Sequence, residues 1–252
     1  MSKPTRHLLL VLSLFALTAC GKQTFDIGNE APEVEIKKCT LLSQKKKYEK
    51  AVECLEIFKS RFPQTAEGQE AELRIADNYF NQHQFLLAAD SYLSFVKLHR
   101  THPDVDYALF RAGLSYFKEA PKAIDRDQQY LIKAVEQLET ASKSNPRGIY
   151  QEGIVKYLKL ARERMALRIF YVGHFYYRTG QYIASIPRFE ELVQKYPDSS
   201  LVPKSLYNMT KANLKLGRTE EARQAVEFLM EQYPKNRWTT KAQNRYLAAV
   251  KK

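Results

Sequence analysis

Glycine is scarce in this sequence: only 9 of the 252 residues are glycine, whereas 44% are hydrophobic. No segment alternates apolar and polar residues convincingly over the length of a β-strand. Residues that favour helices, such as Ala, Leu, Glu, Lys and Gln, are abundant. These features exclude a mainly β architecture, and we predict an all-α protein.

The motifs of common catalytic sites are also missing. The chain contains no HExxH, GxSxG, P-loop or GxGxxG pattern, and it has only five histidines. Acidic neighbours such as Glu190 and Glu191 do not form a general acid/base pair, because adjacent side chains on a helix point about 100° apart. We therefore expect no enzymatic activity and no cofactor.

His99 and His102 have the spacing of metal ligands, with Asp104 and Asp106 just behind them. A metal site is one interpretation of this stretch. The other is the end of one helix and the start of the next, with either aspartate as the capping residue. We favour the second, because Pro103 breaks the regular helix that would fix the two imidazoles.

The longest apolar run is short and lies at the N-terminus. It covers residues 8–17, follows two basic residues and precedes small residues, as in a secretory signal. The run is too short for a comfortable membrane anchor, and it leads into the sequence LTAC, which resembles the bacterial lipobox. We predict a signal peptide at residues 1–19, a covalent lipid on Cys20 and a lipidated linker at 20–33. The absence of aspartate after Cys20 favours the outer membrane, with the chain facing the periplasm.

Proline recurs in similar settings, in the segments RFP, THP, SNP, KYP and QYP, which end at residues 63, 103, 146, 197 and 234. Alignment on these prolines brings small residues and aromatics into register, as in tetratricopeptide (TPR) repeats of about 34 residues. We predict an α-solenoid of about five TPR-like helical hairpins at 34–252. The hairpins are expected at about 34–64, 65–104, 105–147, 160–198 and 203–236, followed by a C-terminal helix.

The third hairpin contains a charged insertion, residues 118–129, which Pro121 interrupts. Charge and proline predict an exposed loop between two helices. The sequence leaves the role of this insertion open.

Besides Cys20, the sequence holds two cysteines, Cys39 and Cys54. If the first hairpin turns near Lys46 and Lys47, these two cysteines lie opposite each other. Export of the chain permits a disulfide. A bridge between them is one hypothesis, and two packed free thiols are the other.

TPR solenoids have a concave surface that is formed mainly by the first helix of each pair. The repeat alignment places six residues on or near this surface: Asp77, Phe80, Tyr107, Phe110, Leu114 and Phe117. One interpretation is that these side chains bind an extended apolar peptide. The other is that the aromatic rings pack against the neighbouring hairpin.

A lipobox followed by five TPR-like units, with LHRTHPDVDYALFRAGLSYF at 98–117 and DRDQ at 125–128, resembles the BamD family, also known as YfiO/ComL. The resemblance implies a non-catalytic outer-membrane lipoprotein of the β-barrel assembly machinery. It also implies that the C-terminal repeats hold the periplasmic domains of a BamA-like β-barrel protein. The N-terminal repeats would recognise unfolded outer-membrane proteins, and other Bam lipoproteins are possible partners.

Arg178 and Arg188 match basic positions of the family's fourth repeat, and the resemblance makes them candidates for docking the barrel component. Arginine suits this role because its planar fork pairs with carboxylates in a bidentate way. Pro187 leaves the direction of Arg188 open. Either Ser185 caps a helix that starts late, or the helix is kinked.

The formal net charge is +12, which favours anionic partners. The basic residues are nevertheless dispersed, and no motif for nucleic-acid binding is present, so nucleic acid is an unlikely partner. Two alternative functions remain at this point. One is a different periplasmic TPR lipoprotein adaptor, for cell-wall synthesis or a secretion apparatus, and the other is a binder of anionic polymer.

Overall fold

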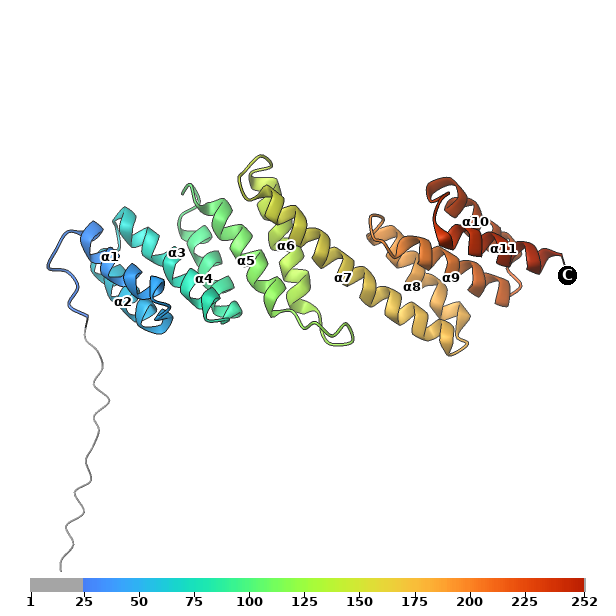
Figure 1. Ribbon diagram of the computed structural model, residues 1–252, viewed down its shortest axis with the longest axis horizontal. Coiled ribbons are helices and arrows are strands. Elements are labelled where there is room, and N and C mark those ends of the chain that lie inside the picture. Colours follow the sequence, from blue (N-terminus) through green and yellow to red (C-terminus); the bar gives the residue numbers. More distant parts are fainter. Residues whose placement is uncertain (1–24, 252) are drawn as a thin grey trace, which may run out of the picture.

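A computed structural model of the chain describes residues 25–251, so Cys20 lies outside the described residues. The helices follow one another along an elongated rod, and each packs mainly on its neighbours in the sequence (Figure 1). The predicted all-α, TPR-like solenoid is thereby confirmed. The helices are α1 (Pro32–Gln44), α2 (Tyr48–Arg61), α3 (Ala66–Asn81), α4 (Phe85–Leu98), α5 (Val105–Glu119), α6 (Gln129–Ser144), α7 (Gln151–Arg178), α8 (Tyr182–Lys195), α9 (Val202–Lys215), α10 (Thr219–Gln232) and α11 (Arg237–Val250).

Four hairpins turn through one residue in the left-handed conformation. Gly180 (φ +78°) lies between α7 and α8, and Gly217 (φ +72°) lies between α9 and α10. Glycine adopts this conformation without strain. At the corresponding turns of the first two hairpins, Lys46 (φ 56°) and His83 (φ 61°) adopt it at a cost of about 1–2 kcal/mol each. The turn geometry is therefore a property of the repeat rather than of one residue type.

Close helix packing explains two glycines inside helices. A Cβ atom at Gly113 of α5 would lie 2.8 Å from Cγ of Leu138 on α6. A Cβ atom at Gly173 of α7 would lie 3.0 Å from the ring of Phe189 on α8. Leu138 and Phe189 are fully buried, so these contacts belong to the core between the helices of one hairpin.

The helix α7 is twice as long as most of the others and joins the two halves of the rod (Figure 1). Its N-terminal half packs on α5 and α6, and its C-terminal half packs on α8 and α9. The fourth hairpin was expected to begin at residue 160, but the helix begins at Gln151. Gly153 does not interrupt it, because the ring of Phe110 covers this position.

The segment between α5 and α6, which contains most of the insertion at 118–129, is fixed by two side chains. The buried amide of Gln128 donates hydrogen bonds to the carbonyl groups of Ala123 (2.9 Å) and Arg126 (3.2 Å). From α7, the Arg164 guanidinium donates to the carbonyl of Pro121. Burial lowers the pKa of Arg164. The loop is therefore attached to the long helix and has a defined shape.

Pro187 lies inside α8, which begins five residues earlier at Tyr182. Ser185 is buried and donates its hydroxyl proton to the Tyr182 carbonyl (2.8 Å), so it does not cap a late helix. The interpretation with a Ser185 cap is therefore wrong. Pro187 is on the exposed side, where water can satisfy the carbonyl that loses its N–H partner.

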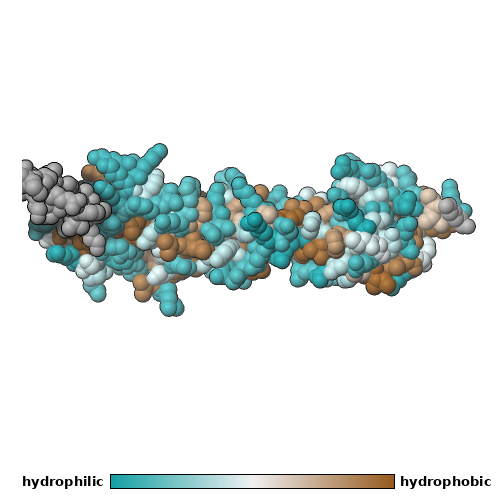
Figure 2. Space-filling view, turned by 90° about the horizontal axis from the view of Figure 1, so that it is seen from below, coloured by the Kyte–Doolittle hydropathy of each residue, from teal (hydrophilic) through white to brown (hydrophobic). Residues whose placement is uncertain are grey.

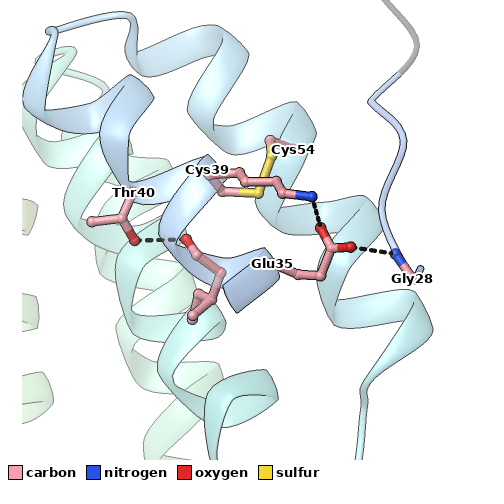
Figure 3. The surroundings of a disulfide bond; sticks show 7 residues. Gly28, Glu35, Cys39, Thr40 and Cys54 are labelled. Atoms are coloured by element: carbon pink, nitrogen blue, oxygen red, sulfur yellow. Dashed lines mark hydrogen bonds and ion pairs between the residues drawn. A yellow bond between two sulfur atoms is a disulfide. The ribbon is translucent and has the colours of Figure 1, made fainter. Parts of the chain in front are cut away.

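The segment at 20–33 was expected to be a linker. Its described part, from residue 25, instead packs on the first hairpin. Ile27 is buried in the same cluster as Cys39 and Phe58. The carboxylate of Glu35, fully buried on α1, accepts hydrogen bonds from the N–H groups of Gly28 (3.3 Å) and Glu30 (3.1 Å), as Figure 3 illustrates for Gly28. The first hairpin thus holds the chain that leads to the expected lipid anchor.

An ion pair completes this attachment. Lys38 Nζ lies 3.1 Å from Oε2 of Glu35 and 3.0 Å from Oε2 of Glu30. Burial acts to raise the pKa of Glu35, but Lys38 and the N–H groups of Glu30 and Gly28 outweigh it, and the pKa lies below its ordinary value. The charged form of Glu35 is therefore the one that the fold stabilises.

Cys39 of α1 and Cys54 of α2 form a disulfide in the structure, with their Cα atoms 5.4 Å apart (Figure 3). Both cysteines are almost completely buried, beside Leu55 and Phe58. The bridge links the two helices of the hairpin that holds the N-terminal segment.

The surface carries hydrophobic patches that are separated by hydrophilic residues along the rod (Figure 2). None of the helices within residues 25–251 combines the length and the hydrophobicity that a membrane crossing requires.

Candidate functional site

Two of the residues predicted for peptide binding meet at one charged centre between α3, α4 and α5. The carboxylate of Asp77 accepts hydrogen bonds from the hydroxyl groups of Tyr107 (2.6 Å) and Tyr92. The guanidinium of Arg111 on α5 donates through Nε to the Tyr92 hydroxyl (3.0 Å). Its Nη2 lies 3.5 Å from Oδ1 of Asp77. One carboxylate thus orders three side chains from two neighbouring helices.

Phe80 belongs to the same centre through a cation–π contact. The guanidinium carbon of Arg111 lies 3.8 Å from the centre of the Phe80 ring. Burial raises the pKa of Tyr107, and Asp77 adds to this effect. Burial acts to lower the pKa of Arg111, but the two phenols and Asp77 raise it on balance. Both tyrosines stay protonated and Arg111 stays charged at any physiological pH.

Phe110 and Phe117 lie along α5 and pack against the first half of α7. Phe110 stacks on Tyr150 with ring centres 6.0 Å apart, and Phe117 lies edge-on to Tyr157 at 5.4 Å. Tyr107 links these rings to the charged centre, because its ring lies 5.5 Å from that of Tyr150. We call this array of half-buried rings from α3, α5 and α7 the aromatic face. It consists of Phe80, Tyr107, Phe110, Phe117, Tyr150 and Tyr157.

Leu114 differs from the other predicted residues. Only 7% of its surface is exposed, so it is part of the core. The structure therefore gives the aromatic rings both contacts with the neighbouring hairpin and partial exposure, whereas Leu114 is not available to a ligand.

Sequence reasoning missed three residues of this site: Arg111, Tyr150 and Tyr157. Arg111 lies one helical turn after Tyr107, a spacing that places both side chains on one face. Tyr150 and Tyr157 lie seven residues apart in a segment that the repeat alignment left without a hairpin. A search for helical periodicity within that segment would have found them.

Arg178 and Arg188 are both exposed, but they lie in different surroundings. Arg178 is the last residue of α7. Arg188 on α8 donates to Glu191 (3.1 Å), which also accepts from Lys195 (2.8 Å). Arg188 therefore has an acidic partner already.

Exposed apolar residues lead along α7 to Arg178. Leu160, Leu167, Tyr171 and Phe175 are 44%, 38%, 50% and 55% exposed. Their spacings of seven, four and four residues place them on one side of the helix, and Arg178 follows three residues later. We call these five residues the outer stripe.

The two histidines have partners within the fold. His99 Nε2 lies 3.0 Å from Oε2 of Glu72, and His102 Nδ1 accepts a hydrogen bond from the N–H of Asp104 (3.1 Å). Asp104 is the N-cap residue of α5, although its side chain makes no capping bond. No group of three or more His, Cys, Asp or Glu side chains within residues 25–251 is arranged to hold a metal ion.

Comparison with known proteins agrees with this architecture. The YfiO family of outer membrane lipoproteins matches residues 37–228. The outer membrane protein assembly factor BamD of Rickettsia prowazekii is 27% identical over 198 residues, which cover 79% of this chain and 78% of the relative. The protein of the same name from Neisseria meningitidis serogroup A is 27% identical over 254 residues, which cover 94% and 95%.

Among solved structures, the complex of the TPR2AB domain of yeast Sti1 with pHSP90 matches 87% of this chain and 84% of that chain, at 14% identity and a TM-score of 0.44. The family match covers most of the residues that the structure describes. The chain therefore belongs to the YfiO family of outer membrane lipoproteins.

Proposed function

We propose that this chain is a non-enzymatic assembly factor for outer-membrane proteins, which works by holding other proteins on a lipid-anchored solenoid. Two relatives that are named outer membrane protein assembly factor BamD align with this chain over most of their length. The observation that supports the proposal best is the aromatic face, because it offers ring surfaces from α3, α5 and α7 beside one fixed ion pair.

The chemistry of the aromatic face suits a segment of an unfolded β-barrel protein. Strands of such proteins alternate apolar and polar residues and are rich in aromatics at the membrane interfaces. Alternate side chains of an extended segment would contact the rings of Phe110 and Tyr157. Aromatic pairs of this kind contribute about 0.5–1.5 kcal/mol each beyond the burial of their area.

The first experiment measures binding of a fluorescein-labelled peptide, taken from a strand of an outer-membrane barrel, to the full mature chain in mild detergent. We expect the variant with Phe110→Ala and Phe117→Ala to bind at least tenfold more weakly. Phe228→Ala is the matched control, since Phe228 is an exposed phenylalanine on α10, and it should leave binding unchanged. Equal affinities for both variants, with unchanged melting temperatures, would show that the rings serve packing alone.

The outer stripe is the second half of the proposal, as the docking site for periplasmic domains of a BamA-like barrel protein. Its apolar residues are 38–55% exposed, and Arg178 adds a cation at one end. Arg188 is the weaker candidate, because docking would first have to break its ion pair with Glu191.

For the docking test, we expect Arg178→Glu together with Leu167→Ser to reduce recovery of the barrel protein at least tenfold in a pull-down from native membranes. Reversal of charge repels the carboxylates that arginine binds, and serine removes apolar contact area. Arg100→Glu, which changes an exposed arginine in another hairpin, is the control. Full recovery of the barrel protein with the double variant would refute docking on the outer stripe. Mass spectrometry of the same preparation also checks the expected lipid on Cys20.

A further inference from the structure

A second array of rings and cations lies in the C-terminal half, on α7, α9 and α11. Lys204 Nζ lies 4.7 Å from the ring centre of Phe170 and 5.7 Å from that of Trp238. Lys211 Nζ lies 4.3 Å from Tyr177 and 4.8 Å from Tyr207. We call these residues the cationic face, which consists of Phe170, Tyr177, Lys204, Tyr207, Lys211 and Trp238.

The cationic face follows the repeat. Phe170, Lys204 and Trp238 are separated by 34 residues each, the length of one TPR repeat. Tyr177 and Lys211 have the same separation, so each pair occupies one position in successive repeats. The array thus uses equivalent positions on the first helix of three consecutive repeats. These helices are α7, α9 and α11, and α9 contacts both of the others.

Cations are crowded here and have no carboxylate partner. Lys241 and Arg237 add two more charges on the ring of Trp238, at 4.9 Å and 4.8 Å. Among residues 25–251, neither of these two nor either lysine of the cationic face lies in an ion pair. Elsewhere on the C-terminal half, cations such as Arg223 and Lys195 do pair with glutamates.

Mutual repulsion is visible in the pKa values of the groups on this face. Burial lowers the pKa of Lys211, and Arg245 and Lys204 lower it further. Burial also lowers the pKa of His174 on α7, with added effects from Lys204, Arg178 and Lys211. A bound anion would relieve this repulsion.

An unused hydrogen-bond donor lies beside the cations. Asn208 is one turn from both Lys204 and Lys211 on α9, and 3% of its surface is exposed. Its amide Nδ2 has no hydrogen-bond partner among the described residues. A buried donor without an acceptor costs about 1–3 kcal/mol, so α9 carries an unpaired polar group between the two lysines.

We propose that the cationic face binds an acidic, extended segment of a partner protein, with carboxylates about three residues apart. Lys204 and Lys211 are seven residues apart on one helix, or about 10 Å. An extended chain of the polyproline II type spans about this distance in three residues and keeps every third side chain on one face. The inference goes beyond the proposed function, which uses the aromatic face and the outer stripe.

The surroundings of the two lysines favour a protein over a lipid surface. Both lysines are half-buried, and ring faces hold their ammonium groups in place between helices. Lysines that serve a membrane surface instead extend their charges away from the fold into the headgroup layer. Rings next to fixed cations match a peptide in which apolar side chains lie between the carboxylates.

The test uses the full mature chain in mild detergent and a fluorescein-labelled 12-residue peptide with glutamate at every third position and leucine or tyrosine between. We expect Lys204→Glu with Lys211→Glu to weaken binding at least tenfold. Lys143→Glu with Lys235→Glu carries the same change in net charge on exposed lysines outside the face, and it should change the affinity less than twofold. The peptide with glutamine in place of glutamate should bind neither the unaltered chain nor the two variants.

Two further measurements keep the test independent of folding defects. Lys204→Met with Lys211→Met keeps the contacts with the rings, and this variant should melt at or above the temperature of the unaltered chain while binding the peptide at least tenfold more weakly. In NMR titrations, the acidic peptide should raise the pKa of His174 in the unaltered chain.

Equal peptide affinity in the two glutamate variants would overturn the proposal. The proposal also fails if Lys204 and Lys211 are needed for binding of phosphatidylglycerol vesicles or duplex DNA but are not needed for binding of the acidic peptide. In that case the face binds a lipid surface or an anionic polymer.

Discussion

Replacement of both Cys39 and Cys54 by alanine is expected to lower the free energy of unfolding of the first hairpin by about 3 kcal/mol. The bridge joins residues with a sequence separation of 15. For a loop of this length, the entropy that a disulfide removes from the unfolded chain corresponds to about 3 kcal/mol. Both side chains are buried, so alanine also leaves a cavity where each sulfur atom was, which adds to the loss.

The effect should be local, because a solenoid is stabilised by contacts between neighbouring repeats. Hydrogen exchange should accelerate in α1 and α2, and in Gly28 and Glu30, which Glu35 holds on that hairpin. Exchange in α8–α11 should stay unchanged and serves as an internal control. Reduction of the unaltered chain should reproduce the exchange pattern of the double variant.

A loss of less than 1 kcal/mol in guanidinium titrations, together with unchanged exchange in α1, would mean that packing of the cluster around Phe58 suffices without the bridge. If the prediction holds, the bridge secures the part of the chain between the expected lipid on Cys20 and the solenoid. A weak first hairpin would make the position of the solenoid relative to the membrane less defined.

The fold was largely predictable, because its signals are local. Prolines follow the ends of α2, α4, α6, α8 and α10, and the repeat of small and aromatic residues identified the hairpins. The continuous α7 was not predictable in this way, since the repeat alignment found no match at 148–159. At Gly153, within this part of α7, the ring of Phe110 from another hairpin packs against the helix, a contact that the repeat pattern does not contain.

The candidate site was predictable in its residue types and only partly in its geometry. Asp77, Phe80 and Tyr107 do meet, as their repeat positions indicate, but Arg111 organises them and depends on contacts between α3, α4 and α5. Leu114 lies on the same side of α5 as Tyr107 and Arg111 and is nevertheless buried, a difference that its position on the helix does not indicate. Their role in binding stays a prediction that the peptide experiment tests.

The cationic face was not found from the sequence for a related reason. Its lysines occur singly, and a search for charge runs stops at the segment Lys45–Lys47. The separation of 34 residues brings Lys204 between two aromatic rings of neighbouring repeats. Comparison of equal repeat positions, rather than of adjacent residues, would have shown it.

Loss of the Asp77 carboxylate is expected to have the second large effect. Asp77→Ala should lower the free energy of unfolding by about 2–3 kcal/mol, since removal of one partner from a buried ion pair leaves the other without compensation. Side chains of Arg111 and Asp77 are 18% and 32% exposed, so the cost is below that of a fully buried pair. Tyr92 and Tyr107 would also lose the acceptor of their hydroxyl protons.

Two further variants separate charge from hydrogen bonding at this centre. Asp77→Asn leaves Arg111 without its counter-charge but keeps an acceptor oxygen for a tyrosine hydroxyl, so its loss should be smaller than that of Asp77→Ala by about 1 kcal/mol, the size of one neutral hydrogen bond. Arg111→Met keeps an apolar contact with Phe80, and in combination with Asp77→Ala it should be less harmful than the two single losses added together. A double-mutant cycle by urea denaturation should give a coupling of about 1–2 kcal/mol between the two residues. Additive losses would mean that Asp77 and Arg111 act independently, and that the order of the aromatic face depends on ring packing rather than on the ion pair beneath it.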